Sequence, residues 1–463
     1  MRARLPLIGC VLLVSLGLVA PPADAVERPV RPTVTTVWTA PTGTSVVGGL
    51  AAASTGPGTA TVAWWTDQRP GRRLLVASSP DWRPTVVARV PVAEERDAPF
   101  LSRTSVVRGP AGAVVVWSVD PRNEADPRVL YAAAQVDGQW SSPVPLGSAR
   151  FLTVDDVEAD DAGVTVLWSS CDAVCSGGRL TASRLVDGAW SATVLDPASA
   201  VREPRLVRDA PDRSTVYWLT RDSIQQSTWL GTQGSPATSV FARATPGLDG
   251  SLQADAATDG TTVLSWRATS DRPGWVAAVR QAGAWSSPIP IANVLDTFFP
   301  PQVDAVSARG TPTLAASGTS PRCCAQYSVQ RWDGGAWVPL TPAELATAVT
   351  VDGRTELGRV SGTPWSPADQ AKAWAGSGRV DAHESVRTPG GAVVQVVAAS
   401  PSRRRHLLGV RRLSAGQWGP LLRVTGPAQV ACVDGCAVAA PDERSVVLAW
   451  TTPRAVRVTT IRP

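Results

Sequence analysis

The chain has 463 residues and a formal net charge of +5, with 44 Lys and Arg residues against 39 Asp and Glu residues. The basic residues are arginines spread along the chain, and Lys372 is the only lysine. A scattered charge of this size differs from the clustered basic surface of nucleic-acid-binding proteins, so we expect no nucleic-acid partner. With only 2 histidines, mechanisms built on several histidines are also disfavoured.

The N-terminal segment has the pattern of a secretory signal peptide. Two early arginines precede an apolar run from Leu5 to Ala20, and Ala23–Ala25 matches the small-residue pattern of a cleavage site. We therefore predict a signal peptide at residues 1–25 and an exported, extracellular chain at residues 26–463. No second apolar stretch approaches the roughly 20 residues of a membrane span, so none is predicted.

The mature chain repeats a unit of about fifty residues. Its first mark is an apolar strand that ends near a tryptophan, at Trp65, Trp117, Trp168, Trp218, Trp266 and Trp450. The four tryptophans from Trp117 to Trp266 follow one another at intervals of 51, 50 and 48 residues. A regular period of this length with strand patterning predicts an all-β fold, a β-propeller of four-stranded blades. Eight blades fit the repeats best, and seven is the alternative.

The second mark of the repeat is another tryptophan, placed after a glycine-containing turn. It stands at one register in five repeats: Trp140, Trp190, Trp285, Trp337 and Trp418. A residue repeated in this way is expected to pack between adjacent blades. The alternative is that some of these rings stack on the faces of sugars.

The first strand of each blade is expected to line the centre of the propeller. Several acidic residues and one histidine fall on these strands: Glu158, Asp160, Asp255, Asp304, His383 and Glu384. Carboxyl groups that converge to about 5 to 10 Å would suit glycoside hydrolysis. Alternatively, these carboxylates cap turns and accept hydrogen bonds from the backbone.

Six cysteines remain in the mature chain, in three local pairs: Cys171 and Cys175, Cys323 and Cys324, Cys432 and Cys436. An even number in an exported chain predicts disulfides, and the distance between pairs around the ring predicts that each is local. No histidine or further cysteine lies near any pair to complete a zinc site, so we expect neither a metal nor a cofactor.

One interval breaks the period. The excess residues, about 341–378, contain two sequences typical of helix starts, so we predict an inserted excursion with one or two short helices. By strand direction, this insert belongs to the face that carries the loops between second and third strands, called face A. Aromatic residues on its loops are the predicted ligand-binding residues: Phe298, Phe299, Trp365 and Trp374.

The two ends of the chain complement each other. The last repeat ends after its third strand, Ala455–Ile461, and Val37–Pro41 supplies a fourth-strand pattern near the start of the mature chain. Pairing these segments would remove two exposed strand edges, so we predict a single domain closed by its N-terminal strand.

The hairpin sequence D-G-x-W-S, present at Asp137–Ser141 and Asp187–Ser191, resembles that of secreted bacterial propeller-repeat proteins of the sialidase and Asp-box (BNR-like) superfamily. The resemblance implies a propeller with degenerate repeats. We expect a monomeric binding or scaffold protein for carbohydrate, a cell-envelope polymer or a surface protein. The alternative is a sialidase-like glycoside hydrolase or lyase that uses the central carboxylates.

Overall fold

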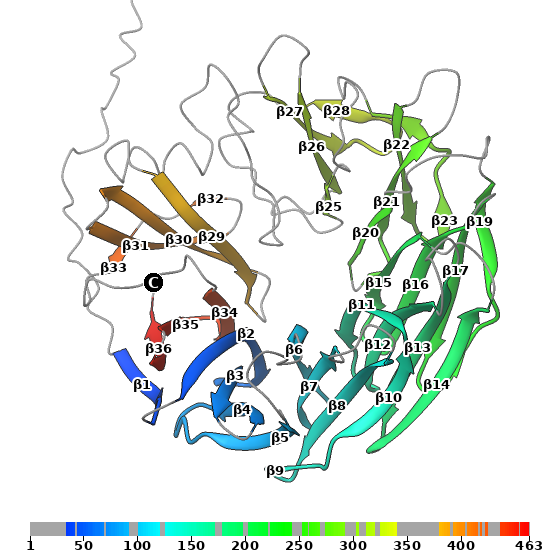
Figure 1. Cartoon of the computed structure of the whole chain (residues 1–463). Coiled ribbons are helices and arrows are strands. Elements are labelled where there is room, and N and C mark those ends of the chain that lie inside the picture. The colour runs from blue at the N-terminus through cyan, green and yellow to red at the C-terminus, as the bar shows by residue number, and fades with distance from the viewer. Residues whose placement is uncertain are drawn as a thin grey trace, which may run out of the picture.

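The computed structural model is built from β-strands, which form eight sheets in the described part of the chain (Figure 1). It describes residues 34–41, 44–68, 71–91, 101–120, 126–171, 178–197, 202–220, 223–242, 252–257, 259–268, 274–291, 302–304, 312–319, 325–339, 379–388, 392–402, 405–414, 417–418, 422–424, 436–452 and 454–462. Seven of these sheets are antiparallel meanders of strands consecutive in sequence, and the eighth joins three strands near the C-terminal end of the chain to one near the N-terminal end. Each sheet is called a blade, and the blades are numbered in chain order by their first strands. The predicted all-β class is confirmed.

The first four blades occupy the first half of the chain. Blade 1 consists of β2 (Ser45–Gly56), β3 (Thr59–Gln68), β4 (Gly71–Ser78) and β5 (Thr85–Pro91). Blade 2 consists of β6 (Leu101–Gly109), β7 (Gly112–Val119), β8 (Arg128–Val136), β9 (Gln139–Trp140) and β10 (Val144–Ala149). Blade 3 consists of β11 (Phe151–Ala159), β12 (Val164–Cys171), β13 (Arg179–Val186) and β14 (Ala189–Asp196). Blade 4 consists of β15 (Arg202–Ala210), β16 (Arg213–Leu219), β17 (Ser223–Leu230), β18 (Gln233–Gly234) and β19 (Thr238–Ala242).

The remaining blades follow the same order. Blade 5 consists of β20 (Leu252–Ala256), β21 (Thr262–Ala268), β22 (Gly274–Gln281), β23 (Ala284–Trp285) and β24 (Ile289–Pro290). Blade 6 consists of β25 (Gln302–Asp304), β26 (Thr313–Thr319), β27 (Ala325–Trp332) and β28 (Trp337–Pro339). Blade 7 consists of β29 (Arg379–Arg387), β30 (Val393–Ser402), β31 (Arg405–Ser414), β32 (Gln417–Trp418) and β33 (Leu422–Val424). Blade 8 consists of β34 (Cys436–Asp442), β35 (Ser445–Thr452), β36 (Ala455–Ile461) and β1 (Val34–Thr39).

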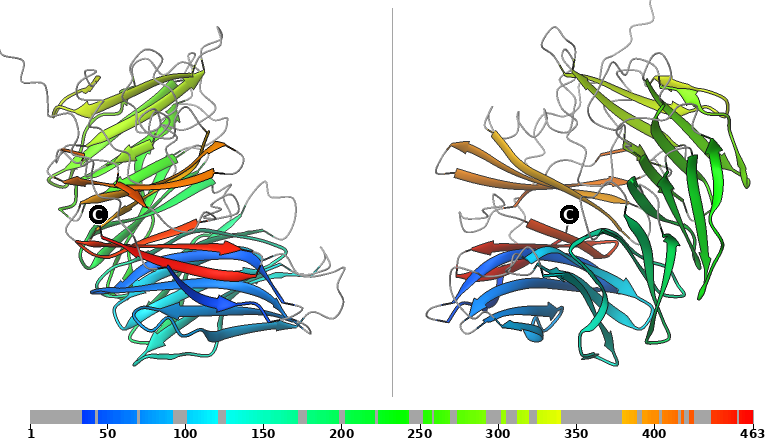
Figure 2. Two further views of the ribbon diagram at one scale, coloured as in Figure 1. Left: turned by 90° about the vertical axis from the view of Figure 1, so that its left-hand side faces the viewer. Right: turned by 45° about the vertical axis from the view of Figure 1, so that its right-hand side comes forward.

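The predicted pairing of the two ends of the chain is confirmed. β1 pairs antiparallel with β36, with Val34 opposite Thr459 and Thr39 opposite Ala455. Blade 8 therefore takes three strands from the C-terminal end of the chain and one from the N-terminal end. The first strands of neighbouring blades contact one another from blade 7 through blade 8 and on through blades 1 to 6. The left view of Figure 2 shows the blades stacked side by side, with their strands running across the molecule.

The second strand of a blade is apolar because both of its faces are covered. In β7, the six residues from Ala113 to Ser118 are all buried, and in β35 the six from Ser445 to Trp450 are buried too. An outer strand differs, since four consecutive residues of β14 are exposed. The continuous apolar runs seen in the sequence thus mark strands packed between two other blades.

The hairpins between third and fourth strands explain the repeated D-G-x-W-S sequence. Asp137 and Gly138 have φ values of 51° and 76°, and Asp187 and Gly188 have 50° and 78°. Two successive positive φ values make the tight turn that matches strand twist, which Asp-Gly adopts readily. The serine after the tryptophan then bonds the third strand, as when the Ala134 amide donates to Ser141 Oγ at 3.1 Å.

Tryptophans fill the junctions between blades, as predicted. The hairpin tryptophans with described side chains pack against clusters shared with the preceding blade: Trp140, Trp190, Trp285 and Trp337. The second-strand tryptophans also face the preceding blade: Trp117, Trp168, Trp218, Trp266 and Trp450.

In blade 1 the sequence alignment of the repeat is off by one residue. Trp64, not Trp65, packs against the preceding blade, blade 8. Trp65 faces blade 2, where its indole N–H donates to Thr104 Oγ1 at 3.0 Å. A strand turns successive side chains to opposite faces, so one residue decides which junction a tryptophan fills.

Candidate functional site at the junction of blades 4 and 5

The predicted central residues lie on first strands, as expected from the repeat. Glu158 lies on β11, Asp255 on β20, Asp304 ends β25, and His383 and Glu384 lie on β29. β15 stands between β11 and β20, since it contacts both strands. Glu158 and Asp255, the two acids whose side chains the structure describes, therefore lie on strands that are separated by β15. The side chains of the other three residues are outside the described part.

Other predicted residues also fall outside the described part of the chain. These are the signal peptide, the insert at about 341–378, and the residues Phe298, Phe299, Trp365, Trp374, Cys175, Cys323, Cys324 and Cys432. Cys436 begins β34, and Cys171 ends β12 in a disulfide-bonded state. The three predicted pairings remain predictions.

Asp160 does not line the centre, because it is buried between blades 3 and 4. One nitrogen of Arg184, Nη2, lies 2.7 and 2.8 Å from its two carboxylate oxygens, and both side chains are fully buried. Ser214 of blade 4 donates to Asp160 Oδ2 at 2.8 Å. The rest of the guanidinium donates to Thr165 Oγ1 and to the Gly231 carbonyl of blade 4, each at 2.5 Å.

The same carboxylate also orders its own turn, which confirms for Asp160 the alternative of a turn-capping acid. Its Oδ1 accepts hydrogen bonds from the amides of Ala162 at 3.0 Å and Gly163 at 2.9 Å. Burial alone raises the pKa of Asp160, but the hydrogen bonds from Arg184 and Ser214 and the charge of Arg184 outweigh it. The pKa therefore lies below its ordinary value, and Asp160 is a structural anion.

Asp209 is the corresponding acid in blade 4, although it lies on the last part of β15 itself, whereas Asp160 follows the end of β11. Asp209 is fully buried and faces blade 5, yet its cations are partly exposed. Arg213 Nε lies 2.9 Å from Oδ1, and Arg280 Nη1 of blade 5 lies 3.6 Å from Oδ2. Thr215 donates to Oδ2 at 3.1 Å. Burial raises the pKa of the neighbouring Tyr217 to about 12, against the opposing charge of Arg280.

Aromatic rings cover the same junction. Phe241 stacks on Trp266 with ring centroids 5.1 Å apart and meets the edge of Trp285 at 5.4 Å. Trp285 also meets Tyr217 edge to face at 6.1 Å. Trp285 pairs with Arg280 across the hairpin, so both project toward blade 4. Phe241 and Trp285 are only half-buried, which leaves aromatic surface beside two partly exposed guanidinium groups.

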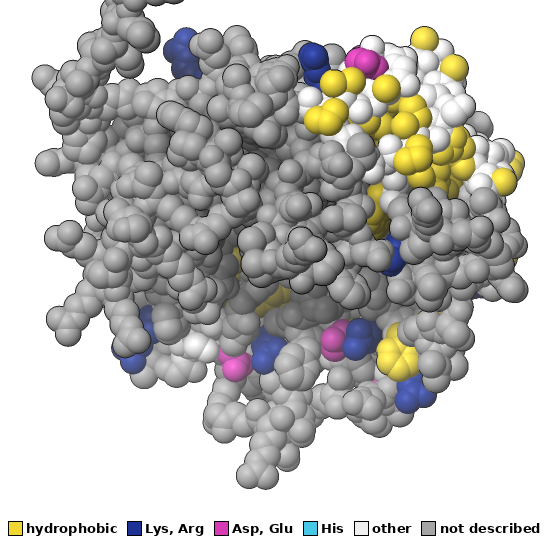
Figure 3. All heavy atoms as spheres, turned by 90° about the horizontal axis from the view of Figure 1, so that it is seen from above, with side chains coloured by type: hydrophobic (Ala, Val, Ile, Leu, Met, Phe, Trp, Pro, Cys, Tyr) yellow, Lys and Arg dark blue, Asp and Glu magenta, His cyan; other side chains and the backbone are white. Residues whose placement is uncertain are grey.

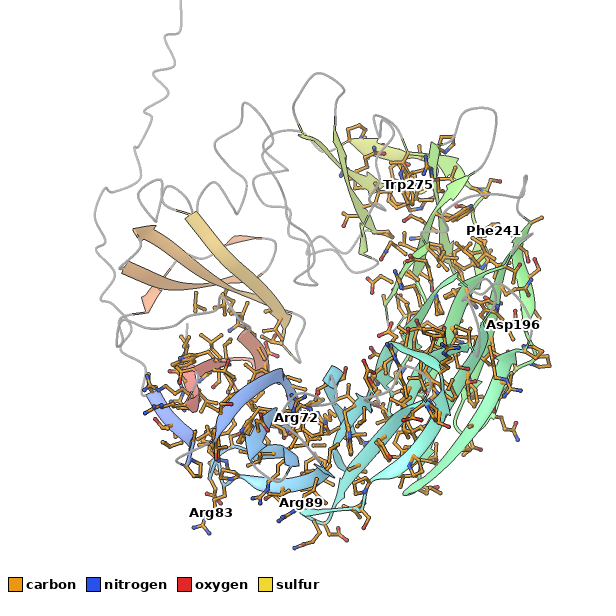
Figure 4. All side chains as sticks on the ribbon, in the orientation of Figure 1. Arg72, Arg83, Arg89, Asp196, Phe241 and Trp275 are labelled. Carbon is orange, nitrogen blue, oxygen red and sulfur yellow. The ribbon has the colours of Figure 1, made fainter. Side chains whose placement is uncertain are left out.

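Phe241 occupies a position on the outer strand at which the residue type differs from blade to blade. Gly147 of blade 2 holds this position, and an added Cβ there would come within 2.4 Å of the Trp168 ring. In blade 3 it is Asp196, which accepts a hydrogen bond from Trp218 at 3.3 Å. Figure 4 shows Asp196 and Phe241 on successive blades along the right-hand side. Only at the blade 4–5 junction, among these three, does the outer strand add a ring.

The junction thus offers half-buried aromatic rings beside hydrogen-bond donors, which suits binding of a polar ligand with apolar faces. Seen from above, hydrophobic side chains of the described residues gather on the right-hand side, where blades 4 to 6 lie in Figure 1 (Figure 3). Within the described ranges, no three His, Cys, Asp or Glu residues form a group suited to a metal ion. No helix in that part of the chain is long and apolar enough to span a membrane.

No family model matches the chain, and no curated protein matches it. Among solved structures, it is similar to the lectin of Aleuria aurantia, a six-bladed β-propeller, here as a mutant bound to Fucα1-6GlcNAc. Identity is 14%, coverage is 63% of this chain and 94% of the lectin, and the TM-score is 0.32. The chain is also similar to the WD40 domain of SCAP from fission yeast. Identity is 12%, coverage is 92% of this chain and 98% of that domain, and the TM-score is 0.40. A third similar structure is the α-L-arabinanase of Penicillium chrysogenum bound to arabinobiose. Identity is 12%, coverage is 66% of this chain and 100% of the arabinanase, and the TM-score is 0.32.

Sequence reasoning missed Arg280, Arg213, Asp209 and Phe241. A signal exists for the acid, since Asp160 and Asp209 are 49 residues apart, close to the period of the repeat. Arg280 had no such signal, because the residues opposite the hairpin tryptophan in blades 2 and 3 are Gln135 and Leu185. Only the packing of blade 5 on blade 4 brings its guanidinium to Asp209.

Proposed function

We propose that the protein is an exported, closed propeller of eight blades that binds carbohydrate or a cell-envelope polymer at the blade 4–5 junction. The observation that carries the binding site is the half-buried Trp285 ring beside Arg280 on one face of the blade. Export rests on the N-terminal sequence pattern, and closure is supported by the β1–β36 pairing.

Sugars have a face of C–H bonds and a rim of hydroxyl groups. An aromatic ring packs against the C–H face, and planar donors such as guanidinium groups donate hydrogen bonds to the hydroxyl groups. The side chains of Arg213 and Arg280 are 32% and 22% exposed, so part of each side chain lies at the surface while its guanidinium group contacts Asp209. Asp209 holds both guanidinium groups in place, which lowers the entropy lost when a ligand binds.

The enzymatic alternative, a sialidase-like glycoside hydrolase or lyase, would use carboxyl groups that converge at the centre, and in a two-carboxylate hydrolase these groups flank the scissile bond. Its candidates with described side chains, Glu158 and Asp255, lie on strands with β15 between them. We therefore place binding first and keep catalysis as a result that the assay below can return.

The test is a glycan array with the purified mature protein, followed by calorimetric titration of the glycans that bind. Trp285→Ala should weaken binding at least tenfold. Trp190→Ala is the matched control, since Trp190 is a half-buried hairpin tryptophan at the blade 2–3 junction and pairs with Leu185 instead of an arginine. Parallel incubations with the same glycans should leave them uncleaved.

Two results would overturn the proposed site. Equal affinity in Trp285→Ala and wild type would exclude the blade 4–5 junction, and loss of binding in Trp365→Ala/Trp374→Ala alone would move the site to the insert. Cleavage of a glycan that stops in Asp255→Asn or Glu158→Gln would establish the enzymatic alternative instead.

A further inference from the structure

Blade 8 carries a pocket that the proposed carbohydrate site does not use. The pocket has a volume of about 600 Å³ and lies at the turn between β34 and β35, lined by Asp442, Glu443, Arg444, Ser445 and Arg462. Arg462 follows β36 directly, beside Ser445, because Val446 and Ile461 are opposite each other in the sheet. The pocket is open to solvent, so a small molecule could reach its lining residues directly.

Both acids of the pocket already have partners. Glu443 Oε2 accepts hydrogen bonds from Thr388 at 2.8 Å and from Arg412 at 3.1 Å, and both donors belong to blade 7. Asp442 Oδ1 accepts from the amide of Arg444 at 2.7 Å, which closes the turn. Glu443 is therefore paired with a cation of blade 7, and one oxygen of Asp442 is bonded within its own turn.

The arginines of the pocket differ from the acids. Arg444 and Arg462 are exposed, and neither guanidinium group bonds or pairs with any residue of the described ranges. With Arg412 included, the pocket and its blade 7 partners carry three guanidinium groups against two carboxylates. The two guanidinium groups thus have no hydrogen bond or ion pair within the described ranges, and Ser445 is next to Arg444 in sequence and beside Arg462 in the sheet.

We propose that this pocket binds the oxyanion group, carboxylate or sulfate, of a small acidic molecule, with Arg444 and Arg462 as its cationic donors. Guanidinium groups bind both oxyanions through paired N–H donors, and their binding weakens as salt screens the charges. The pocket is in blade 8, apart from the blade 4–5 junction, so the proposal does not depend on the carbohydrate site.

The experiment titrates the mature protein with sodium glucuronate and with sodium sulfate at low ionic strength, and with neutral glucose as the uncharged comparison. Arg444→Gln/Arg462→Gln should weaken binding of either anion at least tenfold, and added KCl should weaken it in the wild type. Arg454→Gln is the matched control, because Arg454 is an exposed arginine in the turn at the other end of β35. Trp285→Ala should also leave anion binding unchanged.

Binding of one anion or both with these dependences supports the proposal and identifies which oxyanion the pocket prefers. It is overturned if neither anion saturates the protein, if glucose binds as well as glucuronate, or if the double variant binds like the wild type. Both arginines are exposed, so circular dichroism of the double variant should match the wild type.

Discussion

The blade 3–4 and blade 4–5 junctions use the same acid position in opposite ways. Asp160 pairs with Arg184 of its own blade, and both side chains are fully excluded from solvent. Asp209 pairs with Arg213 of its own blade and Arg280 of the next, and these guanidinium groups are partly exposed. A buried acid can therefore either complete the packing of a junction or hold cations at its surface.

The residue at the position of Arg184 accounts for the difference. In blade 4 this position on the third strand is Thr228, which only reaches Thr215, at 3.1 Å. A short side chain cannot cross to the acid, so the cation has to come from Arg213 or from the neighbouring blade. The outer strand then adds Phe241, and the junction combines charge with aromatic surface.

Among the substitutions at the two junctions, removal of Arg184 should lower the free energy of unfolding most. Arg184→Met leaves Asp160 as a buried charge without its cation, which costs about 3 to 5 kcal/mol of unfolding free energy. Urea denaturation measures the loss, with Arg179→Gln, an exposed arginine on the same strand, as the control. If Arg184→Met does not fold, Arg184→Lys should give an intermediate loss. A loss for Arg184→Met as small as that of the control would contradict the structural role.

The blade 4–5 junction should lose stability at alkaline pH. Tyr217 has a pKa of about 12 in the folded protein against an ordinary value of 10.0, so the unfolded chain loses this proton first. Stability from this residue is complete below about pH 10 and falls by about 2 to 3 kcal/mol as the pH rises to about 12. Tyr217→Phe should remove that part of the decline in unfolding free energy. Equal declines in both proteins would show that burial of Tyr217 does not control it.

The blade 3–4 junction should instead lose stability at acidic pH. The pKa of Asp160 is lower in the folded protein than its ordinary value, so the unfolded chain takes up this proton first. The stabilisation is present above about pH 4 and is lost as the pH falls through the folded pKa. Asp160→Asn should therefore show a shallower loss of unfolding free energy between about pH 5 and about pH 2. Parallel curves for the two proteins would contradict this assignment.

Loss of one cation at the blade 4–5 junction should have the smallest effect. Arg213→Gln removes an ion pair that solvent screens, and Arg280 remains near Asp209, so we expect about 1 kcal/mol or less. Urea denaturation beside Arg184→Met checks the ratio of the two effects. A loss as large as that of Arg184→Met would mean that the two junctions do not differ in this respect.

Much of the fold was predictable because it repeats. The apolar runs, the Asp-Gly hairpins and the segment Val37–Pro41 each obey local rules of strand period, turn conformation and edge pairing. The adjacent tryptophans Trp64 and Trp65 could not be assigned to junctions from the sequence, because successive residues of a strand face opposite sides, and only packing shows that Trp64 faces blade 8. The position of Asp160 just after a first strand predicts a central acid, because the sequence does not reveal that its side chain is buried between two blades.

The sequence by itself determined the strand order, the hairpin turns and the union of the two chain ends, because these depend on residues close in sequence or on a repeated pattern. Only the tertiary structure decided which charges meet. Arg280 reaches Asp209 across 71 residues of chain, and Phe241 reaches Trp285 across 44, because blade 5 packs on blade 4. No local rule relates these residues, since each strand fixes only its own side-chain directions and the angle between blades fixes their partners.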